Sequence, residues 1–138
     1  MTLNPELIRT RCQEIEESLS RLERVKAVPR EDFLKDRDLQ DIASYRLLVA
    51  IEAALGLCYH VAAKQLKRVP EEYAECFAIL SDAQVISKDL SENLQRMARF
   101  RNLLIHMYWK VEYGALFELI QHHLIDLRRF SQAIVSLL

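Results

Sequence analysis

The chain contains very few residues that turn or break a polypeptide, with 2 Gly and 3 Pro among 138 residues. Each hairpin of a β-rich protein needs turn residues of its own, so this scarcity nearly excludes an all-β fold. Apolar side chains recur instead at steps of three and four residues, which is the period of an amphipathic α-helix. The sequence therefore predicts an all-α protein, and its length suits a single domain over residues 1–138.

Start and stop signals predict an up-down bundle of four long helices and one short helix. Asn4 is a good N-cap before Pro5, and the first helix is expected to end before Pro29. After a short segment over residues 31–36, an apolar arc from about residue 38 to 67 is wide enough for a central helix with neighbours on two sides.

The second half of the chain is divided in the same way. Pro70 is expected to open the short helix, and residues 81–87 connect it to the next one. Ser87 is the predicted N-cap of the fourth helix. The positions that share one face of this helix continue as far as Tyr108. A last helix is expected from about Glu112 to the end, where apolar residues indicate a packed C-terminus.

Composition excludes several classes of protein. The formal net charge of −1 gives no general preference for nucleic acids or anionic membranes. Cys12, Cys58 and Cys76 are far apart and form no C-x-x-C pair, which predicts small core residues in a reducing compartment. Neither a leader pattern nor a long uncharged apolar stretch is present, so we expect a cytoplasmic protein without a membrane segment.

The fourth helix carries the most informative irregularity. Its apolar stripe is interrupted by Arg101 and Tyr108, and Asn102, His106 and Trp109 lie in the same short stretch. Between Glu92 and Glu112 the chain has no acidic residue but four basic ones, namely Arg96, Arg99, Arg101 and Lys110. This local positive charge suits a phosphate-bearing partner. In the plainer interpretation, Arg101 pairs with a carboxylate, His106 lies on the surface and the aromatic rings close the bundle.

Residues 101–108, Arg-Asn-Leu-Leu-Ile-His-Met-Tyr, resemble the Arg-x-x-x-x-His-x-Tyr signature of the HepT toxins, which belong to the HEPN superfamily of helical proteins. Residues 50–54 in the long helix, 69–70 before the short helix, 100–102 and 108–111 look like that family as well. The similarity extends over nearly the whole chain.

The resemblance implies a five-helix HEPN bundle and a homodimer in which the two signature segments face a shared cleft. It also implies the toxin of a toxin–antitoxin system, a metal-independent ribonuclease that cleaves RNA, with tRNA or mRNA as targets, and needs no cofactor. The implied partner is a small nucleotidyltransferase antitoxin of the MntA type. It neutralises the toxin by transferring AMP to the signature tyrosine, here Tyr108.

The residue types fit this chemistry. The His106 imidazole can act as general base or acid, Arg101 can hold phosphate oxygens, and Asn102 can orient either group. On one helix Arg101 and His106 lie about 140° apart, so a twofold dimer is needed to bring both to one phosphate. Tyr108 comes seven residues after Arg101 and is expected on nearly the same face. Arg96, Arg99 and Lys110 are the predicted RNA contacts.

Several assignments stay open at this level. Glu52, isolated in an apolar run, is either a buried partner that orients Arg101 or a carboxylate that pairs with another cation. His122 and His123 are adjacent and lack the i, i+4 spacing of a helical metal pair, so no metal site is expected. His60 is expected at the helix surface or at an interface.

Two other functions compete with cleavage. Helical bundles of this kind also serve as binding modules, so the chain can be a non-catalytic, nucleotide-binding or regulatory subunit of a nucleotidyltransferase. Alternatively, the bundle binds RNA through its Lys and Arg side chains without cutting it.

Overall fold

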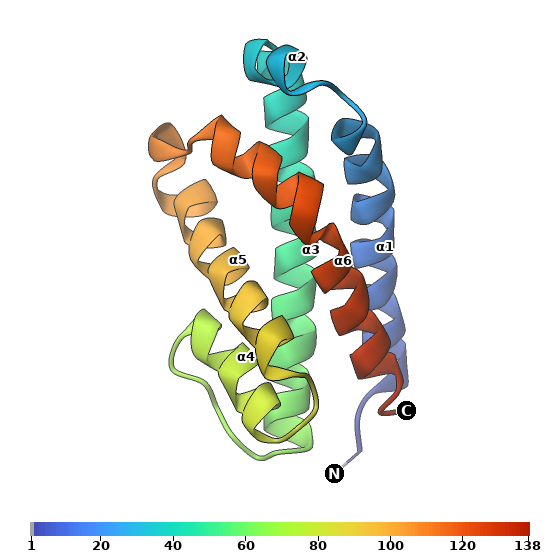
Figure 1. Cartoon of the computed structure of the whole chain (residues 1–138). Coiled ribbons are helices and arrows are strands. Elements are labelled where there is room, and N and C mark those ends of the chain that lie inside the picture. The colour runs from blue at the N-terminus through green and yellow to red at the C-terminus, as the bar shows by residue number, and fades with distance from the viewer. Residues whose placement is uncertain (1) are drawn as a thin grey trace.

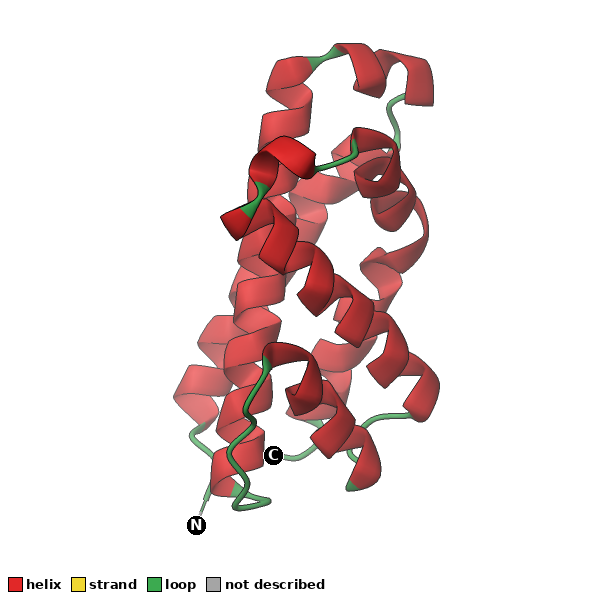
Figure 2. Cartoon of the chain, turned by 90° about the vertical axis from the view of Figure 1, so that its left-hand side faces the viewer, coloured by secondary structure: helices red, strands yellow, loops and turns green. Residues whose placement is uncertain are grey.

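The computed structural model describes residues 2–138, and this part of the chain contains helices and loops but no strand (Figure 2). The prediction of an all-α bundle is therefore confirmed. The elements are α1 (Pro5–Lys26), α2 (Arg30–Lys35), α3 (Arg37–Lys64), α4 (Tyr73–Asp82), α5 (Lys88–His106), the 3₁₀ helix η1 (Tyr108–Lys110) and α6 (Tyr113–Val135).

Helix α3 is the centre of the bundle, as its wide apolar arc predicts. It contacts every other α-helix of the described residues, and Figure 1 shows α1 and α6 on one side of it and α4 and α5 on the other. Its length and apolar composition would also suit a membrane span, but 56% of that window is buried within the bundle. The buried stripe includes Leu47, Ala54, Leu57 and Val61, which is the pattern of a core helix.

Two helix boundaries on either side of the α3–α4 connection differ from the prediction. Helix α3 ends at Lys64 instead of continuing to residue 67, because Lys67 has a φ of 55° and cannot extend a right-handed helix. Helix α4 begins at Tyr73 and not at Pro70, since Glu72 is still extended. The Glu75 carboxylate accepts a hydrogen bond from the Glu71 backbone N–H at 3.0 Å and holds this segment ahead of the helix.

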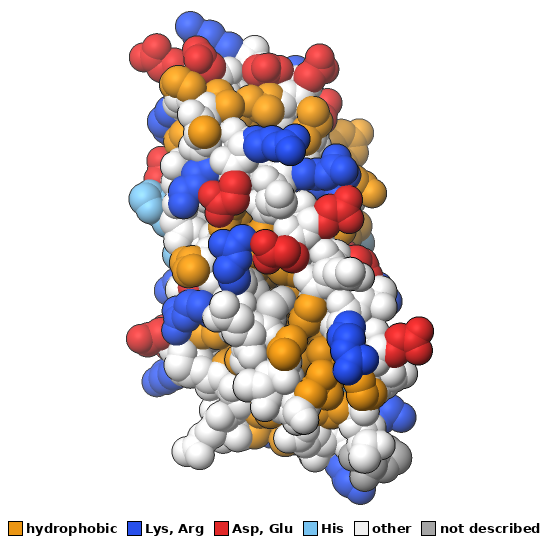
Figure 3. Space-filling model, turned by 90° about the vertical axis from the view of Figure 1, so that its right-hand side faces the viewer, with side chains coloured by type: hydrophobic (Ala, Val, Ile, Leu, Met, Phe, Trp, Pro, Cys, Tyr) orange, Lys and Arg blue, Asp and Glu red, His pale blue; other side chains and the backbone are white. Residues whose placement is uncertain are grey.

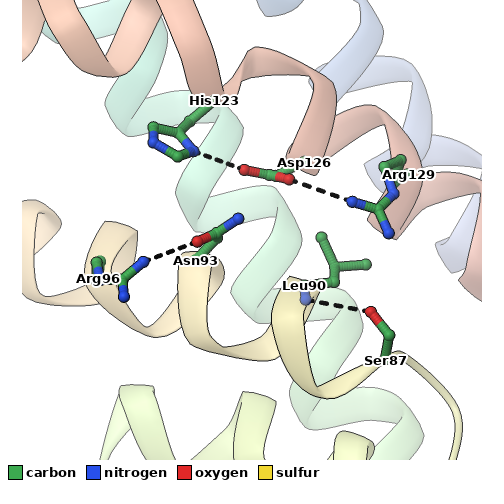
Figure 4. Close-up of polar contacts among 7 residues, drawn as sticks. All are labelled: Ser87, Leu90, Asn93, Arg96, His123, Asp126 and Arg129. Atoms are coloured by element: carbon green, nitrogen blue, oxygen red, sulfur yellow. Dashed lines mark hydrogen bonds and ion pairs between the residues drawn. The ribbon is translucent and has the colours of Figure 1, made fainter.

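The predictions for the α5 N-cap, the segment over residues 31–36 and the C-terminus are confirmed in part. Ser87 caps α5, with its hydroxyl oxygen accepting from the Leu90 N–H at 3.2 Å (Figure 4). The segment over residues 31–36 overlaps the short helix α2, so the described chain has two short helices instead of one. At the C-terminus Ile134 is buried and Leu137 packs against the core, as predicted, whereas Leu138 is exposed.

The α1 face is a mixed-charge surface. Basic and acidic side chains are interspersed on the side that lies to the right in Figure 1 and faces the viewer in Figure 3. Arg21 pairs with Glu17 at 3.3 Å and Arg128 of α6 with Glu16 at 3.3 Å. Exposed pairs of this kind contribute little to stability and mark a solvated face.

Candidate active site

Arg101 is held where three helices meet. Arg101 is only 8% exposed. Its Nε–H donates to the Glu52 carboxylate from α3, and its Nη1 donates to the Asn102 side-chain oxygen at 3.1 Å. The ring of Tyr73, the first residue of α4, lies under the guanidinium, with 4.3 Å between Cζ and the ring centroid. Sequence reasoning left two partners open for Glu52, and the structure pairs it with Arg101.

Glu52 itself is not buried, since its side chain is 46% exposed. Of the two alternatives for Glu52, the one that pairs it with Arg101 is present without the burial it included, because α3 turns this side chain toward solvent. The partial exposure keeps the desolvation penalty of the ion pair small.

The surroundings of Arg101 keep it charged. Burial by itself lowers the pKa of the Arg101 guanidinium, but the hydrogen bond and the negative charge of Glu52, together with Tyr73, outweigh burial and raise that pKa above its ordinary value. A permanently charged guanidinium is suited to holding phosphate oxygens during a reaction.

A cavity of about 660 Å³ lies between the start of α4 and the end of α5. We call it the α4–α5 groove, and its lining includes Tyr73, Arg99, Asn102 and His106. The groove thus brings together two of the three predicted catalytic residues. Arg101 contacts two lining residues directly, Asn102 and Tyr73.

The groove is less basic than the sequence of α5 suggests. The groove is also lined by Glu71 and Glu72, which come from the segment that precedes α4. The stretch without acidic residues between positions 92 and 112 is therefore partly balanced by carboxylates that come from elsewhere in the chain.

Tyr108 does not share a helical face with Arg101, because α5 ends at His106 and Met107 leaves the helical region with φ −141° and ψ 46°. Tyr108 instead opens η1, is 66% exposed and packs edge-on against Trp109 at 5.4 Å. It lines a separate cavity of about 220 Å³ whose walls include Arg37. The expectation that Tyr108 lies beside Arg101 on one continuous helix is wrong.

The three predicted RNA contacts lie in different places. Arg99 lines the α4–α5 groove. Arg96 donates to the Asn93 side chain at 2.8 Å and faces a separate cavity between α5 and α6 (Figure 4). Lys110 is exposed on η1. Only Arg99 therefore shares the groove with Asn102 and His106.

The remaining histidines lie outside the α4–α5 groove: His122 and His123 line the cavity between α5 and α6, and His60 is on α3. His122 lies 3.2 Å from Glu118. His123 shares a hydrogen bond of 2.8 Å with the buried Asp126 (Figure 4). His60 accepts a hydrogen bond from the Asn4 backbone N–H at 2.9 Å. Burial, followed by the nearby positive charge of Lys64, lowers the pKa of His60.

Tyr73 is the site residue that sequence reasoning missed. Its position near Cys76 and Phe77 in the short helix is typical of a core residue, yet Tyr73 is 39% exposed. The one local signal for a position at the edge of the core is the Tyr73 hydroxyl, since a tyrosine combines an apolar ring with a polar tip. Nothing nearby in the sequence could reveal that its ring faces an arginine 28 positions later.

Comparisons with known proteins show the family to which this chain belongs. A family model described as "Ribonuclease HepT-like" matches residues 15–134. The mRNA nuclease HepT of Shewanella oneidensis is 29% identical over 102 residues, which cover 74% of this chain and 77% of that protein. The tRNA nuclease HepT of Aphanizomenon flos-aquae is 22% identical over 139 residues, which cover 98% and 95%.

A solved structure gives the same picture for the fold. The tri-AMPylated HEPN toxin of Shewanella oneidensis, in complex with its MNT antitoxin, matches with a TM-score of 0.88 at 25% identity, over 97% of this chain and 99% of that one. The family match extends through every element from α2 to η1 and includes the α4–α5 groove. This chain therefore belongs to the ribonuclease HepT-like family of helical HEPN proteins.

Proposed function

We propose that this protein is the toxin of a toxin–antitoxin system, an endoribonuclease that cleaves RNA without a metal ion. The observation that carries the proposal is the charged Arg101, linked through Asn102 to a groove that also contains His106. The nuclease names of the two HepT relatives support the same activity. We place the protein in the cytoplasm, where RNA is available.

The residues suit transesterification at an RNA phosphate. The 2′-hydroxyl attacks phosphorus, a 2′-O–P bond forms and the P–O5′ bond breaks, leaving a 2′,3′-cyclic phosphate and a 5′-hydroxyl. The His106 imidazole takes the proton of the 2′-hydroxyl, and water supplies the proton that the departing 5′-oxygen takes up. Arg101 stabilises the charge on the phosphate oxygens, while Asn102 keeps one edge of the guanidinium in place.

We propose further that the active form is a homodimer. Arg101 and His106 both belong to α5 and lie about 140° apart around it, so one protomer does not aim both at one phosphate. A twofold axis presents the same segment twice and can pair Arg101 of one protomer with His106 of the other.

Control of the enzyme is assigned to Tyr108 and a nucleotidyltransferase antitoxin of the MntA type. The solved HEPN toxin is described as tri-AMPylated and in complex with an MNT antitoxin, which supports this partner. Tyr108 is 66% exposed, so its hydroxyl is accessible to such an enzyme. AMP on this oxygen would add bulk and negative charge to the segment that directly follows α5, and would repel an RNA approaching the groove.

The test is cleavage of end-labelled total RNA and tRNA in the presence of EDTA, with protein whose intact mass shows an unmodified Tyr108. Wild-type protein is expected to leave 2′,3′-cyclic phosphate ends, and His106→Ala is expected to abolish cutting. His122→Ala, which removes an exposed histidine paired with Glu118 on α6, is the matched control and should cut like the wild type. Absence of cutting by the unmodified wild type would contradict the proposal.

One observation favours a second function, a non-catalytic regulatory subunit that docks a nucleotidyltransferase. Glu71 and Glu72 line the groove, and carboxylates disfavour RNA phosphate. Protein that does not cut RNA but changes the rate of nucleotide transfer by its partner would support this alternative.

A further inference from the structure

Tyr73 touches both Arg101 and the α4–α5 groove. Its ring centroid lies 4.3 Å from the Arg101 Cζ, which is a close cation–π contact. The same side chain lines the groove together with Asn102 and His106. An aromatic side chain from α4 therefore connects the buried arginine on α5 to the space where a substrate would bind.

The Tyr73 ring is fixed from two directions. Tyr59 of α3 packs against it edge-on, with ring centroids 5.9 Å apart and planes at 80°. The start of α4 is fixed by the hydrogen bond from the Glu71 N–H to the Glu75 carboxylate, only one turn away. A ring that is restrained in this way can set the plane of a guanidinium stacked on it.

We infer that Tyr73 is a positioning residue for Arg101 in the RNA cleavage proposed above, on which this inference rests. Glu52 holds the Nε edge and Asn102 holds Nη1, so these two partners engage two of the five N–H groups of the guanidinium. Neither hydrogen bond fixes how far the guanidinium plane of Arg101 is rotated about the edge that the two partners hold. The face of the Tyr73 ring fixes this rotation and so directs the other N–H groups of the guanidinium toward the phosphate.

The proposal requires the ring face and not the phenolic hydroxyl. Tyr73→Phe keeps the ring, whereas Tyr73→Leu keeps an apolar side chain and removes the π surface. In single-turnover and steady-state cleavage, Tyr73→Leu is expected to lower kcat about tenfold while KM changes less than about twofold, because misalignment affects the transition state more than ground-state binding. Tyr73→Phe is expected to stay within about twofold of wild type.

A matched control is available on α3. Tyr45 is an exposed tyrosine that also packs against an arginine, with 5.4 Å between the Arg46 Cζ and its ring centroid. Tyr45→Leu should cleave like the wild type. In an Arg101→Lys background Tyr73→Leu should cause little further loss, because lysine has no plane for the ring to orient. Equal loss in both backgrounds would mean that Tyr73 acts by stabilising the fold.

A spectroscopic measurement tests the inference without activity. The Nε–H of Arg101 is hydrogen-bonded and the Cζ of the same guanidinium lies over an aromatic ring, so in an NMR spectrum of ¹⁵N-labelled protein the Nε–H should give a shifted, slowly exchanging arginine signal. This signal should persist in Tyr73→Phe and move toward the bulk arginine position in Tyr73→Leu. An unchanged Arg101 signal in Tyr73→Leu would overturn the positioning role. Wild-type protein that gives the shifted Arg101 signal but does not cleave RNA would contradict only the cleavage function.

Discussion

At the scale of single residues, Arg101 depends on neighbours that are distant in sequence. Glu52 is 49 positions away and supplies the charge-assisted contact to Nε. The exposure of Glu52 limits what this ion pair contributes to folding, because solvent screens it. Its main effect should therefore be on the direction and charge environment of Arg101.

Glu52→Gln should accordingly lower RNA cleavage and leave the fold intact. Glutamine can still accept a hydrogen bond but brings no negative charge, so we expect a loss of about tenfold in kcat. Circular dichroism should show an unchanged helix content and melting curve. Glu17→Gln, which breaks an exposed pair with Arg21, is the control, and equal cleavage by both variants would exclude the orienting role of Glu52.

His60 gives a prediction about pH. Its folded pKa lies below the ordinary value of 6.5, mainly through burial, so the folded state binds the proton less readily than the unfolded state. Its contribution to stability is therefore present above about pH 6.5 and decreases as the pH falls through that value. Urea titrations should show a larger drop between about pH 7.5 and 5.5 for the wild type than for His60→Gln, which keeps an acceptor for Asn4. Parallel pH profiles would contradict this assignment.

At the scale of elements, local sequence predicts helix starts better than helix ends. The caps at Asn4 and Ser87 depend on side chains that hydrogen-bond within the next three residues, so they are visible in the sequence. The end of α5 at His106 has no such signal. The 3₁₀ turn that follows moves Tyr108 off the helical face of Arg101 that was predicted for it. This is the largest difference between the predicted site and the structure.

Helix α3 offers a test of helix propensity. Gly56 lies in its middle, and an added Cβ would come no closer than 3.4 Å to the flexible Arg11 side chain. Gly56→Ala is therefore expected to raise the free energy of unfolding by about 0.5–1 kcal/mol, measured by urea denaturation. The reverse change at the exposed Ala63 of α3, Ala63→Gly, should lower it by a similar amount. Destabilisation by Gly56→Ala would mean that Arg11 cannot move aside.

At the scale of the whole molecule, the proposed dimer makes a distinct prediction. Arg101→Ala and His106→Ala should each be inactive alone. When the two variants exchange subunits, half of the dimers are mixed and each mixed dimer regains one intact pair, so about a quarter of wild-type activity should return. Light scattering should give twice the mass of one chain for every sample. No recovery in a dimeric mixture would place the catalytic pair within one protomer.

The sequence by itself determined the helical class, the central position of α3 and the segment that contains Arg101, Asn102 and His106. These follow from the period of the apolar side chains, the near absence of turn residues and a short motif, all of which are local properties. Only the tertiary structure decided which groups meet Arg101. Glu52 and Tyr73 reach it from α3 and α4, and the carboxylates of Glu71 and Glu72 enter a groove that looks purely basic along α5. Contacts between helices depend on packing angles and loop paths, which no short stretch of sequence encodes.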